Sequence, residues 1–138
     1  MIKADRGNNL MVRLTDGEDL IASLVNLRVE SGVILNGVGM LRDVRLGYWN
    51  GSEYETEPIA EPVELLSLQG NFARKGDKEI AIHCHATVAH RGGAALGGHL
   101  LQATVHNTSE IFIYRFAELK LERKMEESGL SGLYPSII

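Results

Sequence analysis

Five histidines lie in one short part of the sequence, between His83 and His106. Two of them, His83 and His85, stand two residues apart in the segment Ile80–Val88, where apolar and polar residues alternate. Because successive side chains of a strand point to opposite faces, both imidazoles should emerge from the same face. Neutral imidazole is a common ligand of zinc and related divalent ions. The pair therefore indicates a candidate metal site.

A third ligand is available at His99, which follows Gly97 and Gly98. Glycines allow a close backbone approach, and catalytic-type zinc sites commonly use three protein ligands. The remaining two, His90 and His106, stand at a predicted loop and a predicted strand end. We interpret both as bystanders. Two alternatives without metal stay open, namely a solvated histidine face and a set of hydrogen-bonding histidines at a subunit interface.

The alternation also separates Cys84 from its neighbours, because it shares the other, apolar face with residues 80, 82, 86 and 88. We predict that this lone cysteine is a small buried hydrophobe. One cysteine forms no internal disulfide, which suits a cytoplasmic protein. The first ten residues hold no apolar signal core, and no run of about 18 apolar residues predicts a membrane helix. We expect a cytoplasmic location.

Two carboxylates, Glu64 and Glu110, sit inside or beside apolar runs, where an unpaired charge is costly. Each is predicted either to face outward or to have a partner such as a ligand histidine, and the outward orientation is favoured. The sequence contains no Gly-x-Ser-x-Gly, Cys-x-x-Cys or His-Glu-x-x-His motif. No reaction is therefore predicted from motifs alone.

The elements that must position these residues are mostly strands. Residues 17–31 have apolar residues at helical spacing and predict the one main helix, with a capping box at Thr15 and Glu18, a competing N-cap at Asp16 and a stop at Gly32. Seven to nine short strands are predicted, at 10–14, 33–39, 44–49, 54–59, 63–68, 79–89, 101–105, 111–116 and 119–121. Asn50-Gly51 predicts a hairpin turn. The fold class is α+β, with a mainly antiparallel sheet.

Composition bounds the class of protein. The chain has 138 residues, enough for a single domain, and 14 basic against 18 acidic residues give a net charge of −4. A free-standing electrostatic DNA binder needs a basic face, so this balance argues against one. We divide the chain into an N-terminal segment (1–9), the domain (10–124) and a weakly patterned C-terminal tail (125–138), which either docks on the body or a neighbouring subunit or frays.

Several segments, taken in order, resemble the plant-and-prokaryote conserved (PPC) domain. They are 14–20, 37–48, 64–71, His83-Cys84-His85, 97–100 and 108–111, and together they span about residues 10–120. The resemblance implies a strongly bent antiparallel sheet assembled as a homotrimer, similar in fold to acetolactate decarboxylase, in which histidines hold zinc. It places His83, His85 and His99 on the family's histidine positions, which implies a divalent metal, zinc foremost.

The resemblance also implies two roles. One is a metal site that binds a small oxygenated ligand, with Arg91 as a carboxylate partner suggested by its position near the ligand segment. The alternative is a DNA-binding or transcription-associated regulator, because plant members accompany AT-hook segments. This chain has no Arg-Gly-Arg-Pro core of an AT-hook. Direct DNA binding would then depend on basic residues gathered by trimerisation, namely Arg13, Arg28, Arg42, Arg45, Arg74 and Lys75.

Overall fold

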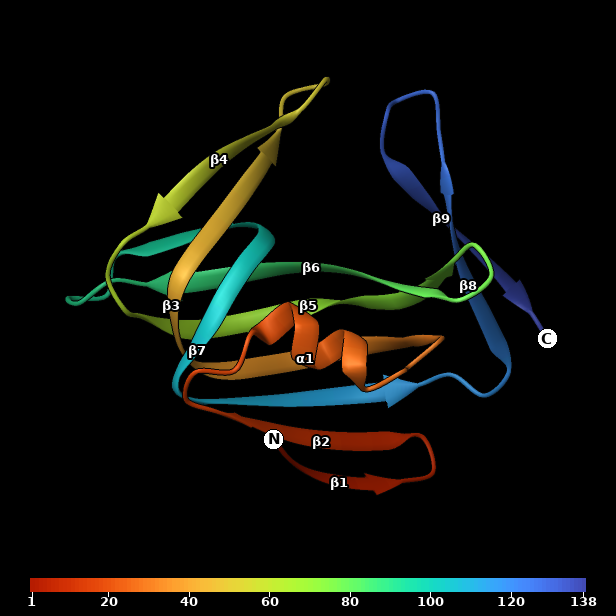
Figure 1. Ribbon diagram of the computed structural model, residues 1–138, viewed down its shortest axis with the longest axis horizontal. Coiled ribbons are helices and arrows are strands. Elements are labelled where there is room, and N and C mark those ends of the chain that lie inside the picture. Colours follow the sequence, from red (N-terminus) through yellow and green to blue (C-terminus); the bar gives the residue numbers. More distant parts are fainter.

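Nine strands and one short helix make up the fold in the computed structural model, which describes residues 1–138 (Figure 1). The elements follow one another as β1 (Ile2–Arg6), β2 (Asn9–Thr15), α1 (Leu20–Asn26), β3 (Gly32–Trp49), β4 (Tyr54–Ile59), β5 (Val63–Lys75), β6 (Glu79–Ala89), β7 (Ala95–Arg115), β8 (Leu119–Met125) and β9 (Ser131–Ile137). The predicted α+β class, dominated by sheet, is confirmed.

All nine strands belong to one sheet, whose main order is β1-β2-β7-β3-β5-β8-β9. β4 pairs with β3, while β6 pairs with both β5 and β7. The pairings of β3 with β5, β5 with β6, β6 with β7 and β7 with β3 form a closed antiparallel ring. A sheet closes in this way only when it is strongly bent, as predicted, and the bend brings the ends of β6 and β7 together.

The core lies inside this bent sheet, beneath the helix. Leu20 and Leu24 of α1 are fully buried, and the helix lies across the sheet in Figure 1. Apolar side chains from β2, β3, β5 and β7 fill the space, with Phe72 among the largest of those fully buried. These strands alternate buried and exposed residues, so each has one core face.

The helix is shorter than the predicted span 17–31. Asp19 is its N-cap, where the side chain accepts a 2.8 Å hydrogen bond from the backbone N–H of Ala22. The predicted contact between Thr15 and Glu18 does form, with Glu18 accepting at 2.7 Å from the Thr15 N–H, but it closes the turn before the helix. Arg28 adopts a left-handed conformation with φ of 57° soon after the last turn. The helix therefore ends before Gly32, which opens β3 instead.

Several predicted strands are parts of longer ones. The segments 33–39 and 44–49 are both within β3, and 101–105 and 111–116 belong to β7 apart from residue 116. Bulges between paired residues let β3 and β7 bend without ending. The terminal segments 1–9 and 125–138 hold β1 and β9, and β9 pairs with β8 along its whole length. The single helix, α1, could not cross a membrane.

Candidate metal centre

Two neighbouring strands bring the three predicted ligands together. His83 and His85 lie on the same face of β6, as the alternation predicts. His99 is on β7, and its backbone is paired directly with that of His85. Cross-strand partners have adjacent side chains on one face of a sheet. The closure of the ring at β6 and β7 therefore converts two distant positions in sequence into one cluster, contributed by a single chain.

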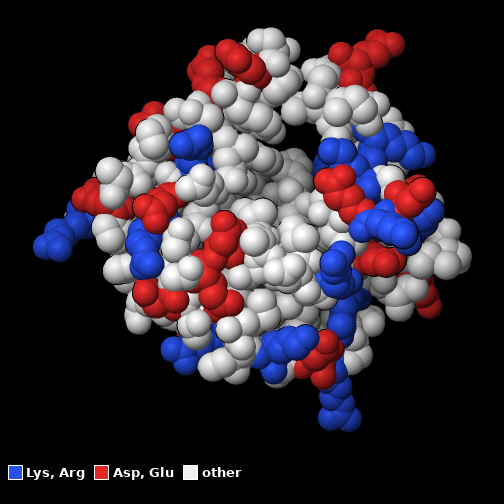
Figure 2. Space-filling model, in the orientation of Figure 1, with Lys and Arg blue, Asp and Glu red and all other residues white.

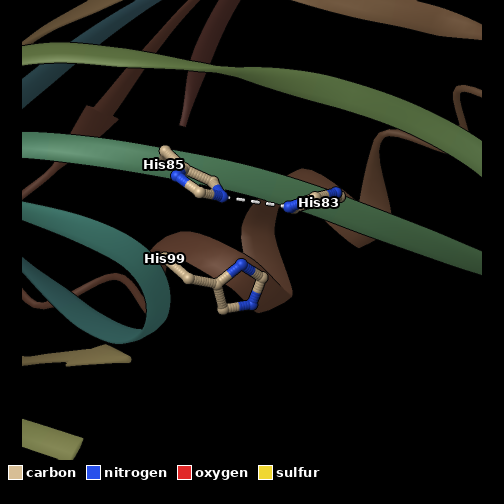
Figure 3. A group of neighbouring side chains, drawn as sticks. All are labelled: His83, His85 and His99. Carbon is tan, nitrogen blue, oxygen red and sulfur yellow. Dashed lines mark hydrogen bonds between the residues drawn. The ribbon is translucent and has the colours of Figure 1, made fainter. Parts of the chain in front are cut away.

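The three imidazoles lie close enough together to contact one metal ion. Ligand nitrogens of the three histidines all lie within 4.8 Å of one another. The ring centroids are 5.0 to 5.4 Å apart, and Nε2 of His83 lies 3.1 Å from Nε2 of His85. Figure 3 shows these two rings joined by a hydrogen bond, with the His99 ring below them. No other group of three or more histidine, cysteine or acidic residues gathers in this way.

Cys84 lies on the opposite face of β6 and is only 1% exposed. Burial raises the pKa of its thiol to about 12. Gly70 of β5 is paired with it, and a Cβ on Gly70 would stand 2.1 Å from the carbonyl oxygen of His83. The prediction that Cys84 belongs to the core is confirmed, and a glycine at position 70 lets β5 approach the backbone beneath the histidines.

His99 is held against aromatic rings. Tyr54 of β4 stacks on it with centroids 4.8 Å apart and planes at 18°, and Trp49 meets Tyr54 edge-on. Burial foremost, together with the neighbouring His83, His85 and Arg123, lowers the pKa of His99 to about 4. Its Nδ1 is buried and has no hydrogen-bond partner. The His99 imidazole is therefore neutral at pH 7 and has a free nitrogen.

His83 is held by Arg123 of β8. The Arg123 guanidinium lies 3.1 Å from Nδ1 of His83 and also donates to the side-chain oxygen of Asn71 at 2.7 Å. Arginine only donates, so Nδ1 is the acceptor and the neutral ring carries its proton on Nε2, which donates to His85. Burial, followed by Arg123 and His85, lowers the pKa of His83. The lowered pKa values favour the neutral rings of His83 and His99.

This donor set fits a divalent ion of the zinc type. Zinc takes neutral imidazole nitrogens, and a three-histidine site leaves a coordination position open. The buried, unpartnered Nδ1 of His99 is the kind of orphaned polar atom that a metal would satisfy. Binding through Nε2 of His83 requires its proton to move to Nδ1, because a neutral imidazole has one N–H.

A cavity of about 200 Å³ opens beside the cluster. His83, His99, Tyr54, Lys75 and Arg123 supply its polar side, together with Ser131 of β9. Figure 2 shows the surface hollowed between the β3–β4 hairpin and the β8–β9 hairpin, with basic side chains at the edge beside β8. Sequence reasoning missed Tyr54 and Arg123 as site residues, because each is far from the histidines in sequence and carries no local motif.

The remaining candidates lie elsewhere. His90 pairs with Glu61, and Nδ1 of His106 lies 3.2 Å from the guanidinium of Arg42, so both are outside the cluster as predicted.

Glu64 and Glu110 are exposed strand residues, which agrees with the favoured orientation. Arg91 is in an exposed turn and does not line the cavity. Its position does not support the suggested role beside the ligands, because the turn that joins β6 to β7 lies four residue pairs beyond the paired His85 and His99.

Comparisons with known proteins agree with this architecture. The family model of the Plants and Prokaryotes Conserved (PCC) domain matches residues 1–117. The chain is 30% identical over 120 residues to the bifunctional protein GlmU of a Synechococcus strain. That alignment covers 82% of this chain and 18% of GlmU, so the chain spans about a fifth of the length of this curated relative.

Solved structures share the whole fold. A plant- and prokaryote-conserved (PPC) protein of Pyrococcus horikoshii is 31% identical, with a TM-score of 0.86 over 96% of this chain and 94% of that one. A metal-containing protein of Archaeoglobus fulgidus is 27% identical, with a TM-score of 0.83 over 97% and 99%. A protein of Bacteroides thetaiotaomicron, named as a candidate DNA-binding protein, is 24% identical, with a TM-score of 0.88 over 96% of each chain. The last likeness shows the fold alone.

Proposed function

Because the chain belongs to the Plants and Prokaryotes Conserved domain family, we propose that it is a homotrimeric, cytoplasmic metal-binding protein. His83, His85 and His99 are the proposed ligands, and zinc is the proposed metal. The observation that carries the proposal is the meeting of three imidazoles, with all ligand nitrogens within 4.8 Å. The name of the Archaeoglobus relative, a metal-containing protein, supports it.

The site would bind a small oxygenated molecule in the adjoining cavity. When bound, a zinc ion supplies Lewis-acid polarisation of an oxygen placed on its open position. Tyr54 fixes the plane of His99 by stacking, and Arg123 fixes the ring of His83 through Nδ1. The cavity walls exclude part of the surrounding water. This arrangement serves either a sensor of that molecule or an enzyme that acts on it.

The proposed homotrimer has a candidate contact surface. Exposed apolar side chains stand on the solvent side of four neighbouring strands, β2, β7, β3 and β5. They are Met11, Phe112, Leu35, Val38 and Leu66, each between 38% and 48% exposed. A contiguous apolar face on a small protein commonly marks a protein interface. Phe112→Glu should then give monomers in sedimentation analysis, while Tyr48→Glu at the far end of β3 should leave the assembly intact.

The cytoplasmic location is proposed on the single cysteine. Cys84 is free and buried, and the chain has no second thiol with which to form an internal disulfide. This usage is typical of reducing compartments. Fractionation of the native host cell tests the location.

Metal analysis tests the central part of the proposal. The full chain, purified without a histidine tag, should contain close to one zinc per chain, or regain it after chelation and dialysis against zinc. The triple variant His83→Ala, His85→Ala, His99→Ala should not, while His90→Ala should bind as the parent protein does. Less than one equivalent per three chains, with no rebinding, would contradict the metal site.

A DNA-associated regulatory role is the second proposal. A relative that shares the fold, from Bacteroides, is named as a candidate DNA-binding protein. Two of the basic residues that would have to contact phosphate are already paired, Arg42 with Asp16 at 2.8 Å and Arg74 with Glu30 at 3.2 Å. Positive and negative side chains are also interspersed on the face in Figure 2. Phosphate contacts produce a steep loss of affinity with salt, so absence of binding at low salt removes this role.

A further inference from the structure

The cavity beside the histidines is lined by two cationic side chains and by no carboxylate. Lys75 comes from β5 and Arg123 from β8. Neither is in an ion pair with an acidic residue, whereas Arg42, Arg74 and Arg115 are. The chain as a whole has more acidic than basic residues, so this local excess of positive charge runs against its composition. Such a cleft attracts an anion.

The Arg123 side chain is fixed in place. It donates to the Asn71 side chain at 2.7 Å and to the backbone carbonyl of Ser131 at 2.9 Å, and it contacts Nδ1 of His83. Its buried Nε has no partner. The protein therefore holds the guanidinium in one position beside the histidines without neutralising its charge. These contacts use both N–H groups of Nη2 and one of Nη1, which leaves one N–H of Nη1 to donate to a carboxylate.

This arginine comes from a part of the chain outside the family match. The matched residues end at 117, and the β8–β9 hairpin follows at residues 119–137. The hairpin supplies Arg123, Leu130 and Ser131 to the cavity, while the histidines come from the matched part. The three histidines and Lys75 thus come from the matched part of the chain, whereas Arg123 comes from the hairpin that follows it.

We infer that the β8–β9 hairpin makes the histidine site selective for small anions of the carboxylate class. Arg123 is the main anchor of the carboxylate, and Lys75, which is more exposed, is a weaker one. The inference rests on the proposed function, since it names the ligand class of that same site. A small 2-oxo or 2-hydroxy acid combines a carboxylate for Arg123 with a second oxygen for the open position of the metal.

The protonation of His83 links the two binding events. In the arrangement described above, Arg123 donates to Nδ1 of His83. Ligation of a metal through Nε2 leaves the ring proton on Nδ1, and Arg123 then loses an acceptor. A carboxylate oxygen provides a replacement acceptor for that N–H. Binding of the metal should therefore raise the affinity of the site for the anion, and binding of the anion should raise its affinity for the metal.

Calorimetric titration with pyruvate and its neutral counterpart pyruvamide tests the inference on the full chain. We expect the zinc-loaded protein to bind pyruvate at least ten times more tightly than pyruvamide. Arg123→Gln should weaken pyruvate at least tenfold and pyruvamide much less, so that the ratio of the two affinities falls toward one. Lys75→Gln should weaken pyruvate about threefold. Arg91→Gln, a matched loss of charge outside the cavity, should change neither.

The same titrations on chelator-treated protein separate the contribution of Arg123 to pyruvate binding from the contribution of the metal. Preference for pyruvate in the metal-free protein supports the anion site even if no zinc binds, in which case only the proposed metal function fails. A pyruvate-to-pyruvamide ratio near one in both forms, or no pyruvate binding at 100 mM, overturns the inference. An unchanged ratio in Arg123→Gln does the same. If circular dichroism shows that Arg123→Gln does not fold, the test relies on two other results. They are the pyruvate affinity of Lys75→Gln and the ratio of pyruvate to pyruvamide affinity in the parent protein.

Discussion

The cluster of histidines shared by β6 and β7 and the two histidines outside it, His90 and His106, use the same residue type in different ways. At the junction, His83, His85 and His99 face one another, and the pKa values of His83 and His99 are lowered by burial and by neighbouring positive groups. Outside the cluster, His90 beside the β6–β7 turn lies against Glu61, and His106 within β7 lies 3.2 Å from Arg42 and 3.9 Å from Asp16. The outer two are single rings among charged side chains, whereas the cluster gathers three rings, and burial favours the neutral form of two of them.

The difference indicates that the surroundings, and not the residue type alone, distinguish the three histidines proposed as ligands. Only a neutral imidazole offers a nitrogen lone pair. The sheet provides neutrality at the junction by removing water and by placing Arg123 rather than a carboxylate beside His83. The predictions below test this contrast, beginning with the largest effect.

Removal of one clustered histidine should cause the largest loss of zinc affinity. His99→Ala is expected to weaken zinc binding by at least about 100-fold, because even partners that only orient ligands contribute roughly 10- to 100-fold. His106→Ala should have no measurable effect. Competition against a zinc-binding dye provides the affinities. Equal losses in the two variants would show that the cluster is not the binding site.

The aromatic support of His99 should matter less. Tyr54→Ala removes the ring that stacks on the imidazole and is expected to weaken zinc about tenfold. Tyr48→Ala is the matched control, because Tyr48 is in the same β3–β4 hairpin and 70% exposed. The same dye competition measures both. Parent-like affinity in Tyr54→Ala would mean that stacking does not orient the ligand.

The low pKa of His99 should appear as a loss of stability on acidification. In the unfolded chain His99 has a pKa near 6.5, whereas in the folded protein its pKa is about 4. The free energy of unfolding of metal-free protein should thus fall as pH is lowered from 6.5 toward 4, and not change from this source above 6.5. His99→Gln should reduce the fall between pH 7 and 5 by on the order of 1 kcal/mol, allowing for partial solvent contact of the ring.

Urea unfolding at the two pH values, with chelator present, measures this difference. His106→Gln, outside the buried cluster, should keep the full fall. A His99→Gln variant that loses as much stability as the parent protein would mean that His99 titrates normally in the folded chain.

The smallest effect concerns Cys84, the neighbour in sequence that faces the core. Cys84→Ala should leave zinc affinity within about twofold, and should cost roughly 1 kcal/mol of stability from lost packing. The native thiol should resist alkylating reagents until the protein unfolds, since burial raises its pKa to about 12. Rapid labelling of folded protein, or loss of zinc in the variant, would place the thiol on the histidine face.

Local patterns predicted the parts of the fold that depend on local physics. The alternation over 79–89 matched β6 at both ends, and it separated His83 and His85 from Cys84. The hairpin signal at Asn50-Gly51 matched the turn between β3 and β4. These features depend on neighbours in sequence, where side-chain periodicity and turn chemistry are visible.

Features that depend on distant pairings were not visible. Bulges carry β3 and β7 through positions that resemble strand ends, and the closed ring of β3, β5, β6 and β7 follows from contacts across the whole chain. Arg123 reaches His83 from 40 positions away. The helix ended early because Arg28 takes a left-handed conformation where helical spacing continues. The role of Arg91 was assigned from proximity in sequence, and the fold places it elsewhere.

Anomalous diffraction at the zinc edge, from crystals of tag-free protein grown without added metal, tests the central claim most directly. We predict a single anomalous peak per chain at bonding distance, about 2.0–2.1 Å, from one nitrogen of each of His83, His85 and His99. The contradicting result is the absence of any peak there, also after soaking in zinc, with Nε2 of His83 still hydrogen-bonded to His85 at 3.1 Å.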